Sequence, residues 1–335
     1  MKALRFHETG EPGDVLTVEE VPEPTAGPGQ LLVSVRAAPA SFPDVLLCRG
    51  QYQVSPPLPM TPGLELCGTV TAVGDGVTRF APGDRVIGNP TPLGGAFAER
   101  AILEEANAFA APESLGDAEA SALGIGYQTG WFALHRRARL REGETLLVHA
   151  AAGGVGSAAV QLGKAAGATV IGVVGGASKA RHCRDLGADL VIDRQREDFI
   201  PAVKEFTGGR GADVVFDPVG GDAYAGSTKC VAFEGRILVI GFAGGTIPTP
   251  GLNHVLIKNY SIIGLHWGLY LRHDPDAIVE CHRRLTALAD AGAITPLVTE
   301  RLSLADTADG VQRLAVGGTS GRIVCEPPAT TRSTP

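Results

Sequence analysis

Residues 146–176 read LLVHAAAGGVGSAAVQLGKAAGATVIGVVGG. A short apolar run is followed by three alanines and by a turn that contains three glycines, and a segment of helical character comes next. Residues 151–156 match the G-x-G-x-x-G dinucleotide fingerprint with alanine at the first position. An ordinary tight turn between a strand and a helix is the alternative, but the surrounding pattern favours a cradle for a pyrophosphate. We predict that this cofactor-binding turn is formed by Ala151, Gly153, Gly154, Val155 and Gly156.

Strands and helices alternate around this turn. We expect strands at 145–150, 169–174, 189–193, 212–217, 235–242 and 260–268, and helices at 157–166, 178–186 and 199–207. Alternation at this spacing is typical of βαβ units, which build a parallel sheet. The predicted fold class is therefore α/β, with a doubly wound, Rossmann-type sheet in this part of the chain.

The first part of the chain has a different pattern. Short apolar runs separated by turn residues predict strands at 30–38, 66–77, 83–89 and 95–103, which indicates a β-barrel. Residues 117–140 have helical spacing, with Asp117 as the expected cap. A further helix is expected at 275–291, followed by a final strand, and we expect this tail to rejoin the first domain. The expected domains are 1–122, 123–268 and 269–335.

Composition narrows the function classes. A chain of 335 residues is long enough for two domains, and its 44% hydrophobic and 19% charged residues are typical of a globular protein. A formal net charge of −7 without a basic block argues against nucleic-acid partners and anionic membranes. No secretory signal or membrane span is expected, and six widely spaced cysteines are typical of reduced thiols in a cytoplasmic protein.

The turn after the strand expected at 169–174 indicates which nicotinamide cofactor the chain should bind. NAD-specific sites place an acidic residue about 20 residues after the glycine run, where it binds the ribose 2′-hydroxyl. This chain has Gly175 and Ser178 there, followed by Lys179, and Arg194 follows the next strand. Cations and a hydroxyl attract a 2′-phosphate, so NADPH is favoured over NADH. The alternative for Lys179 and Arg194 is ordinary solvated surface.

The order of these motifs resembles a known family. The barrel-like first part, HAAAGGVGSAAVQLGKAAGA (149–168), DVVFDPVGG (213–221) and KNYSIIGLHWG (258–268) resemble the medium-chain dehydrogenase/reductase superfamily. Within it, the chain is similar to the zinc-independent quinone oxidoreductases, related to zeta-crystallin and to the enoyl reductase domains of polyketide synthases. The resemblance implies a GroES-like catalytic domain built from both chain ends, a Rossmann domain, and a homodimer joined along strand 261–265.

The same resemblance indicates whether the chain should bind a zinc ion. Zinc-dependent members carry a G-H-E motif, whereas this chain has Gly63-Leu64-Glu65, and no cysteine stands at the earlier ligand position in PASFPDVLL. Zinc needs several converging nitrogen or sulfur ligands, so we expect no metal and a structural role for Glu65.

The resemblance also implies further site residues. Segment 41–52 would line the nicotinamide pocket, with Ser41 and Tyr52 as catalytic candidates and Tyr52 as a possible proton donor. His266 is a third catalytic candidate. For both Tyr52 and His266, a structural role is the alternative. Further cofactor contacts are implied for Thr129, Val219, Gly241, Phe242, Ala243, Leu265, Trp267 and Arg322.

The sequence thus predicts an NADPH-dependent reductase of quinones or of α,β-unsaturated carbonyl compounds that acts without metal. The alternative is a non-catalytic NADPH-binding protein, like some relatives of zeta-crystallin.

Overall fold

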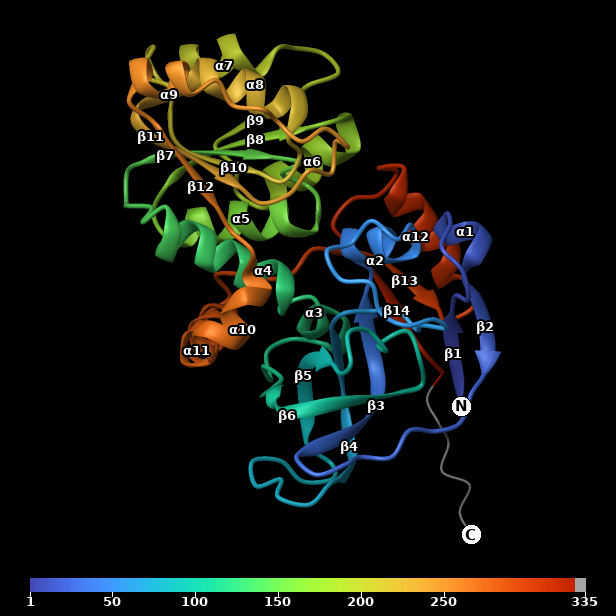
Figure 1. Cartoon of the computed structure of the whole chain (residues 1–335). Coiled ribbons are helices and arrows are strands. Elements are labelled where there is room, and N and C mark those ends of the chain that lie inside the picture. The colour runs from blue at the N-terminus through green and yellow to red at the C-terminus, as the bar shows by residue number, and fades with distance from the viewer. Residues whose placement is uncertain (329–335) are drawn as a thin grey trace. The chain divides into compact units, whose positions relative to one another are not determined.

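The computed structural model describes residues 1–328 and divides the chain into two compact units (Figure 1). The barrel unit contains residues 1–124 and the chain from Thr295 onward, and the sheet unit contains residues 125–294. The predicted boundary near residue 122 agrees with this division. The predicted return at residue 269 is wrong, because residues 269–294 belong to the sheet unit.

The barrel unit is built on a mostly antiparallel sheet, in which β13 and β14 pair in parallel, and part of this sheet closes on itself. Its strands follow the order β13-β14-β3-β4-β5-β6, and β3 also pairs with β6, which closes β3 to β6 into a barrel. The bounds are β3 Gln30–Pro39, β4 Leu66–Val73, β5 Arg85–Pro90, β6 Arg100–Ala110, β13 Val298–Ser303 and β14 Arg322–Glu326. A separate hairpin joins β1 (Lys2–Arg5) to β2 (Thr17–Glu20).

Four helices accompany the barrel: α1 (Pro12–Val15), α2 (Phe42–Cys48), α3 (Asp117–Ser121) and α12 (Thr307–Ala315). The predicted cap at Asp117 is wrong, because Gly116 is the N-cap of α3. The Asp117 carboxylate instead accepts a hydrogen bond from Arg85 at 2.7 Å.

The sheet unit holds an all-parallel sheet in the order β12-β11-β10-β7-β8-β9. The bounds are β7 Thr145–His149, β8 Thr169–Val174, β9 Leu190–Asp193, β10 Ala212–Asp217, β11 Val231–Val239 and β12 Ser261–Gly264. The strand order reverses between β7 and β10, and doubly wound folds bind ligands at such a reversal, outside the carboxyl ends of the strands. The predicted α/β fold class is confirmed.

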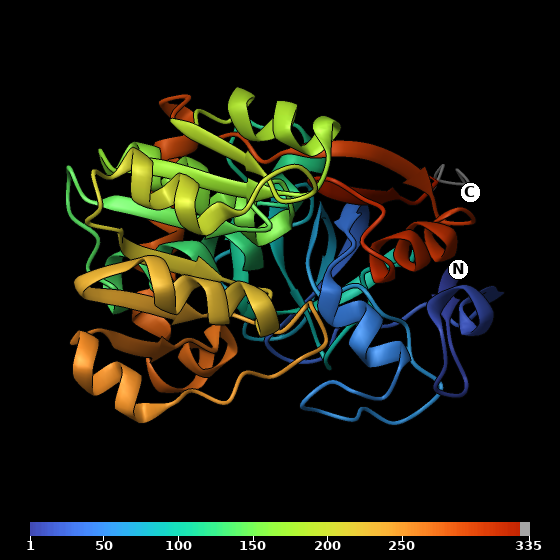
Figure 2. The ribbon, with the colours of Figure 1, turned by 90° about the horizontal axis from the view of Figure 1, so that it is seen from above.

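Helices cover both faces of this sheet. In Figure 1, α7 (Phe199–Phe206) and α8 (Gly221–Cys230) lie along one face, and α5 (Gly154–Ala165) and α4 (Ile125–Trp131) along the other, while Figure 2 views the same layers from above. The remaining helices are α6 Ala177–Asp185, α9 Leu252–Lys258, α10 Tyr270–His273 and α11 Pro275–Asp290. Between the layers, branched side chains from the strands form the core, among them Leu147, Ile171, Val215 and Ile237.

Several predicted elements are shorter than expected, among them the helix at 117–140 and the strand at 260–268. The helix expected at 117–140 is divided into α3, α4 and the π-helix η1 (Phe132–Arg137). Strand β12 ends at Gly264, because a 3-10 turn, η2 (Trp267–Leu269), follows. Across residues 1–328, no helix combines the length and apolar character that crossing a membrane requires.

Candidate functional site

The glycine run forms a close strand-to-helix turn in the sheet unit. β7 ends at His149, Ala150 takes a positive φ of 48°, and Gly153 is the N-cap of α5. A Cβ on Gly156 would overlap the carbonyl oxygen of Ala150, so only glycine lets α5 start this close to β7. Gly153, Gly154 and Val155 are partly exposed at this turn, so the first amides of α5 lie where an anion can reach them.

Helix α4 lies beside this turn. A Cβ on Gly126 would stand 3.6 Å from the carbonyl oxygen of Gly154, so the start of α4 comes close to the start of α5. Thr129 is buried on α4. The hydroxyl of Tyr127, also on α4, accepts a hydrogen bond from Gln161 at 2.7 Å, which holds the two helices together.

A basic group forms at the turn between β8 and α6. The Arg194 guanidinium lies over Gly175, where an added Cβ would meet its Nε at 3.2 Å. Burial and the neighbouring charge of Arg194 lower the pKa of Lys179, so the two cations lie near each other beside this turn. Ser178 is exposed in the first turn of α6. The structure thus brings together the residues predicted to select the cofactor.

One residue that holds this turn in place was not predicted. Asp193, at the end of β9, accepts hydrogen bonds from the backbone N–H groups of Gly176 at 2.8 Å and Gln195 at 3.1 Å. Those bonds lower the pKa of its carboxyl group. Asp193 therefore fixes the turn that carries Gly175, and its charge is engaged with backbone amides.

The loops after β10 and β11 are joined by hydrogen bonds. The Asp217 carboxylate accepts from the N–H groups of Val219 at 2.8 Å and Gly220 at 3.0 Å. The N–H of Ala243 donates to the carbonyl of Pro218 at 3.0 Å. The Phe242 carbonyl accepts from the N–H of Gly245 at 2.8 Å. The Ala243 N–H and the Phe242 carbonyl are therefore engaged within the protein, and the prediction that residues 241–243 offer backbone groups to the cofactor applies to their other backbone groups.

The segment after β12 carries three more candidates. The N–H of Leu265 donates to the Val239 carbonyl at 3.1 Å, which extends the parallel ladder by one residue. His266 is exposed. The indole Nε1 of Trp267 donates to Gln128 on α4 at 2.9 Å, and this bond fixes the segment against α4.

The barrel unit holds a buried polar cluster at the start of α2. The Asp44 carboxylate is fully buried and accepts from the N–H groups of Ser41 at 2.8 Å and Gly63 at 2.9 Å. Burial raises the pKa of Asp44 to about 6. Arg322 is also buried, and it donates to Glu65. The Glu65 carboxylate is therefore part of a structural ion pair, as expected.

Two atoms of this cluster have no hydrogen-bond partner among the described residues: the Ser41 hydroxyl and Nε of Arg322. Buried polar atoms are nearly always hydrogen-bonded, so unpartnered ones are good candidates for binding a ligand or water. Burial lowers the pKa of Arg322 to about 10, so its guanidinium remains charged at neutral pH. The roles predicted for Ser41 and Arg322 stay predictions.

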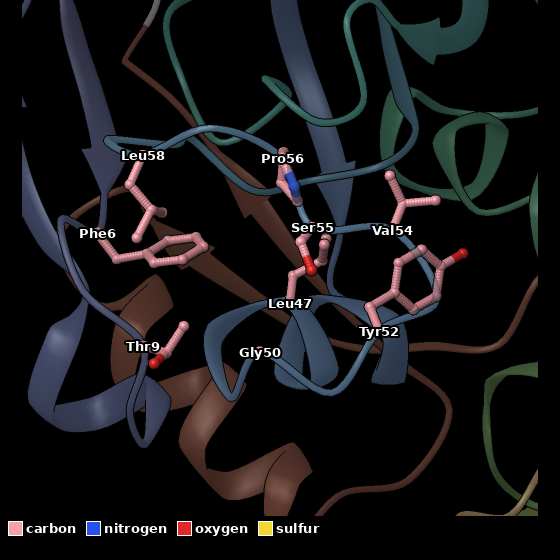
Figure 3. Close-up of a pocket in the computed structure, with 9 residues that line it drawn as sticks. All are labelled: Phe6, Thr9, Leu47, Gly50, Tyr52, Val54, Ser55, Pro56 and Leu58. Atoms are coloured by element: carbon pink, nitrogen blue, oxygen red, sulfur yellow. The ribbon is translucent and has the colours of Figure 1, made fainter.

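Tyr52 follows α2 and is half-buried. Burial, together with the charge of Asp44, raises the pKa of its phenol, so Tyr52 is protonated and able to donate at neutral pH. Its ring lines a cavity whose other walls include Phe6, Leu47 and Leu58 (Figure 3).

The residues at the position of the zinc ligands do not fit zinc. Leu64 offers no donor atom and is buried. The Asp44 carboxylate accepts from two amides, and Glu65 is paired with Arg322. Among residues 1–328, no three His, Cys, Asp or Glu side chains converge where a metal ion could bind. Zinc binding requires such convergence, so the residues at this position do not form a zinc site.

Two family models match this chain. The alcohol dehydrogenase GroES-like domain matches residues 27–113, and the zinc-binding dehydrogenase model matches residues 154–283. These segments lie in the barrel unit and the sheet unit respectively. Fold and matches together define a dehydrogenase/reductase of the GroES-plus-Rossmann class.

Known relatives narrow the class. A quinone oxidoreductase-like protein 2 homolog of Nematostella vectensis is 35% identical over 96% of this chain and 88% of its own. A phthioceranic/hydroxyphthioceranic acid synthase of Mycobacterium bovis is 33% identical over 96% of this chain, which spans 15% of that synthase. The structure of Escherichia coli quinone oxidoreductase complexed with NADPH has a TM-score of 0.90 at 29% identity, covering 98% of this chain and 100% of that one. The chain belongs to the medium-chain dehydrogenase/reductase superfamily, in its quinone oxidoreductase branch.

Proposed function

We propose that this protein is an NADPH-dependent reductase that delivers hydride to a conjugated acceptor without a metal ion. The observation that carries the proposal is the basic turn after β8, where Arg194 lies over Gly175 and Lys179, in the first turn of α6, lies near Arg194. A relative in the same branch is complexed with NADPH, which supports the assignment of the cofactor.

The residues present fit this cofactor. The glycine turn at 153–156 leaves space for a pyrophosphate against the amides of α5. Lys179, Arg194 and Ser178 supply two cations and a hydroxyl for a 2′-phosphate. Bound NADPH supplies the hydride, and the protein supplies position and electrostatics.

Tyr52 is the proton donor in this proposal. Its raised pKa keeps the phenol protonated at neutral pH, so the proton is available to a substrate. Ser41 would donate to the acceptor oxygen, on which negative charge develops. His266, exposed in the sheet unit, is the alternative proton donor.

Two acceptor classes fit, quinones and α,β-unsaturated carbonyl compounds. The unsaturated carbonyl is favoured, because Tyr52 offers a proton for the carbon next to the one that is reduced, whereas a reduced quinone takes protons readily from water. A relative that is an acid synthase is in line with an acyl-type acceptor.

The decisive experiment is steady-state oxidation of NADPH with a panel of quinones and enones, with NADH in parallel. Turnover of enones above quinones, with NADPH preferred, is the expected result. Turnover of quinones alone would reassign the acceptor. If NADPH binds tightly while no acceptor in the panel is reduced, the chain is a non-catalytic NADPH-binding protein.

The protein would act as a homodimer in the cytoplasm. β12 is the edge strand of the sheet, and α9 beside it in the chain has no buried residue. An exposed strand edge next to exposed apolar side chains is usually covered, and two-fold pairing is the commonest way. The six cysteines are free and buried, which suits a reducing compartment.

A further inference from the structure

A small cavity in the barrel unit lies next to Tyr52. It is lined by residues that follow β1, by α2, and by the loop that follows α2 (Figure 3). Its volume is 140 Å³. A protein cavity of about 150 Å³ lined by apolar side chains accommodates benzene, so this cavity can hold a ring or a short alkyl chain.

The lining determines which chemical group fits. None of the nine lining residues is charged, and the only polar side chains besides Tyr52 are the hydroxyls of Thr9 and Ser55. Hydrocarbon side chains form the remaining walls: Phe6, Leu47, Val54, Pro56 and Leu58. A carboxylate or phosphate would lose its hydration here without gaining a partner, so the cavity suits an uncharged apolar group.

The floor of the cavity depends on a glycine. Gly50 takes a positive φ of 65°, and a Cβ there would come within 3.0 Å of the Thr9 methyl group. Absence of a side chain at Gly50 leaves the floor open.

The mouth is apolar as well. Val54 and Leu58 remain 54% and 42% exposed on the loop after α2. Apolar side chains grouped at the rim of a hollow are typical of a ligand site. A ligand entering here would cover both.

Tyr52 links the cavity to the chemistry. Figure 3 shows its ring at one edge of the cavity and its hydroxyl directed away from the other lining residues. An acceptor whose reacting carbons face that hydroxyl can therefore extend an apolar tail along the ring into the cavity. We infer that this cavity binds the alkyl tail of the acceptor, which makes the enzyme selective for medium-length alkyl enones. The inference rests on the proposed function.

The test is a homologous series of straight-chain 1-alken-3-ones, compared by kcat/KM with saturating NADPH. Burial of each further methylene should raise kcat/KM by about fourfold until the cavity is full, after which the gain stops. Thr9→Phe and Ser55→Phe place a ring into the cavity from exposed positions, and each should abolish the preference for longer chains. Thr78→Phe is the matched control, since Thr78 is exposed on a turn of the same unit and does not line the cavity.

A binding measurement separates this inference from the proposed function. Saturated straight-chain methyl ketones should bind with an affinity that rises with chain length, measured by saturation-transfer NMR without turnover. This rise should disappear in Thr9→Phe and Ser55→Phe and persist in Thr78→Phe. If enones are not reduced but this pattern holds, the reaction is misassigned and the tail site stands. A length dependence that is the same in all three folded variants and the wild type overturns the tail site.

Discussion

At the scale of single residues, the choice of cofactor rests on the side chains around Gly175. Lys179→Ala should weaken NADPH binding by about 1.5–3 kcal/mol, the range of a hydrogen bond to a charged group, because the 2′-phosphate loses one cation. NADH lacks that phosphate, so its affinity should stay nearly unchanged. Titration of both cofactors by fluorescence measures the difference.

Lys204→Ala is the control for that variant. It removes the same charge from the exposed face of α7 rather than from the turn after β8. Its NADPH affinity should match the wild type. Equal losses for NADPH and NADH in Lys179→Ala would contradict the role assigned to Lys179.

Tyr52 offers a second test at this scale. Tyr52→Phe should slow enone reduction by about 10²- to 10⁴-fold, as expected when a general acid is lost. The phenyl ring keeps the apolar contacts, so NADPH binding and folding should be preserved, and quinone reduction should suffer less. Stopped-flow rates with both acceptors measure this, with Tyr270→Phe as the control, since Tyr270 stacks on Phe132 in the sheet unit. An unchanged enone rate would assign the proton to solvent or to His266.

The site residues that could be predicted from the sequence are those that belong to a short motif with fixed spacing. The glycine turn and Lys179 lie at fixed offsets from one another, so the fingerprint located them. The Arg322–Glu65 pair joins residues 257 positions apart, and the hydrogen bond that the Gly176 N–H donates to Asp193 depends on which strands are neighbours. Neither interaction has a signal in the sequence, because each forms only when the sheets are assembled.

At the scale of elements, the start of α5 depends on the absence of a side chain at Gly156. Gly156→Ala would force the Ala150 carbonyl away, at a cost of about 1–3 kcal/mol in the free energy of unfolding, as for overpacked sites. The same shift should weaken NADPH binding, because the amides of α5 move. Chemical denaturation with and without NADPH measures both effects.

Gly126→Ala provides the comparison. Its Cβ would meet only the Gly154 carbonyl oxygen, at the ordinary distance of 3.6 Å, and alanine is favoured over glycine within a helix by about 0.5–1 kcal/mol. Stability should therefore hold or rise. If the Gly156→Ala protein is as stable as the Gly126→Ala protein, α5 can lie farther from β7 without a loss of stability, which would contradict this prediction.

The sequence predicted the bounds of some helices and strands more accurately than those of others. Buried parallel strands such as β10 (Ala212–Asp217) were predicted to the residue, because unbroken apolar runs between turn residues are distinctive. Residues 95–103 were predicted as a strand, yet β6 begins at Arg100. Residues 42–48 form α2 in a segment for which no helix was predicted, and the hydrogen bonds that the N–H groups of Ser41 and Gly63 donate to Asp44 hold it in place.

At the scale of the whole molecule, the division of the chain was predicted at one boundary and missed at the other. Helix α11 was expected to rejoin the barrel, but its apolar face, Ile278, Cys281, Leu285 and Ala289, is buried within the sheet unit. Arg136 of η1 also pairs with Asp274 at the start of α11, at 2.7 Å. Helical periodicity shows that a helix has a buried face, but not which unit covers that face.

Assembly is the remaining property at this scale. Leu256 and Ile257 on α9 are 77% and 75% exposed, close in sequence to the edge strand β12. If two copies join along β12, a charge at Leu256 should separate them, because a buried unpaired carboxylate is costly. Leu256→Glu should thus change a dimeric mass to a monomeric one in light scattering at micromolar concentration. Val316→Glu is the matched control, since Val316 is 72% exposed but belongs to the barrel unit, and it should remain dimeric. A wild-type monomer, or a dimer that both variants leave intact, would contradict the proposed seam.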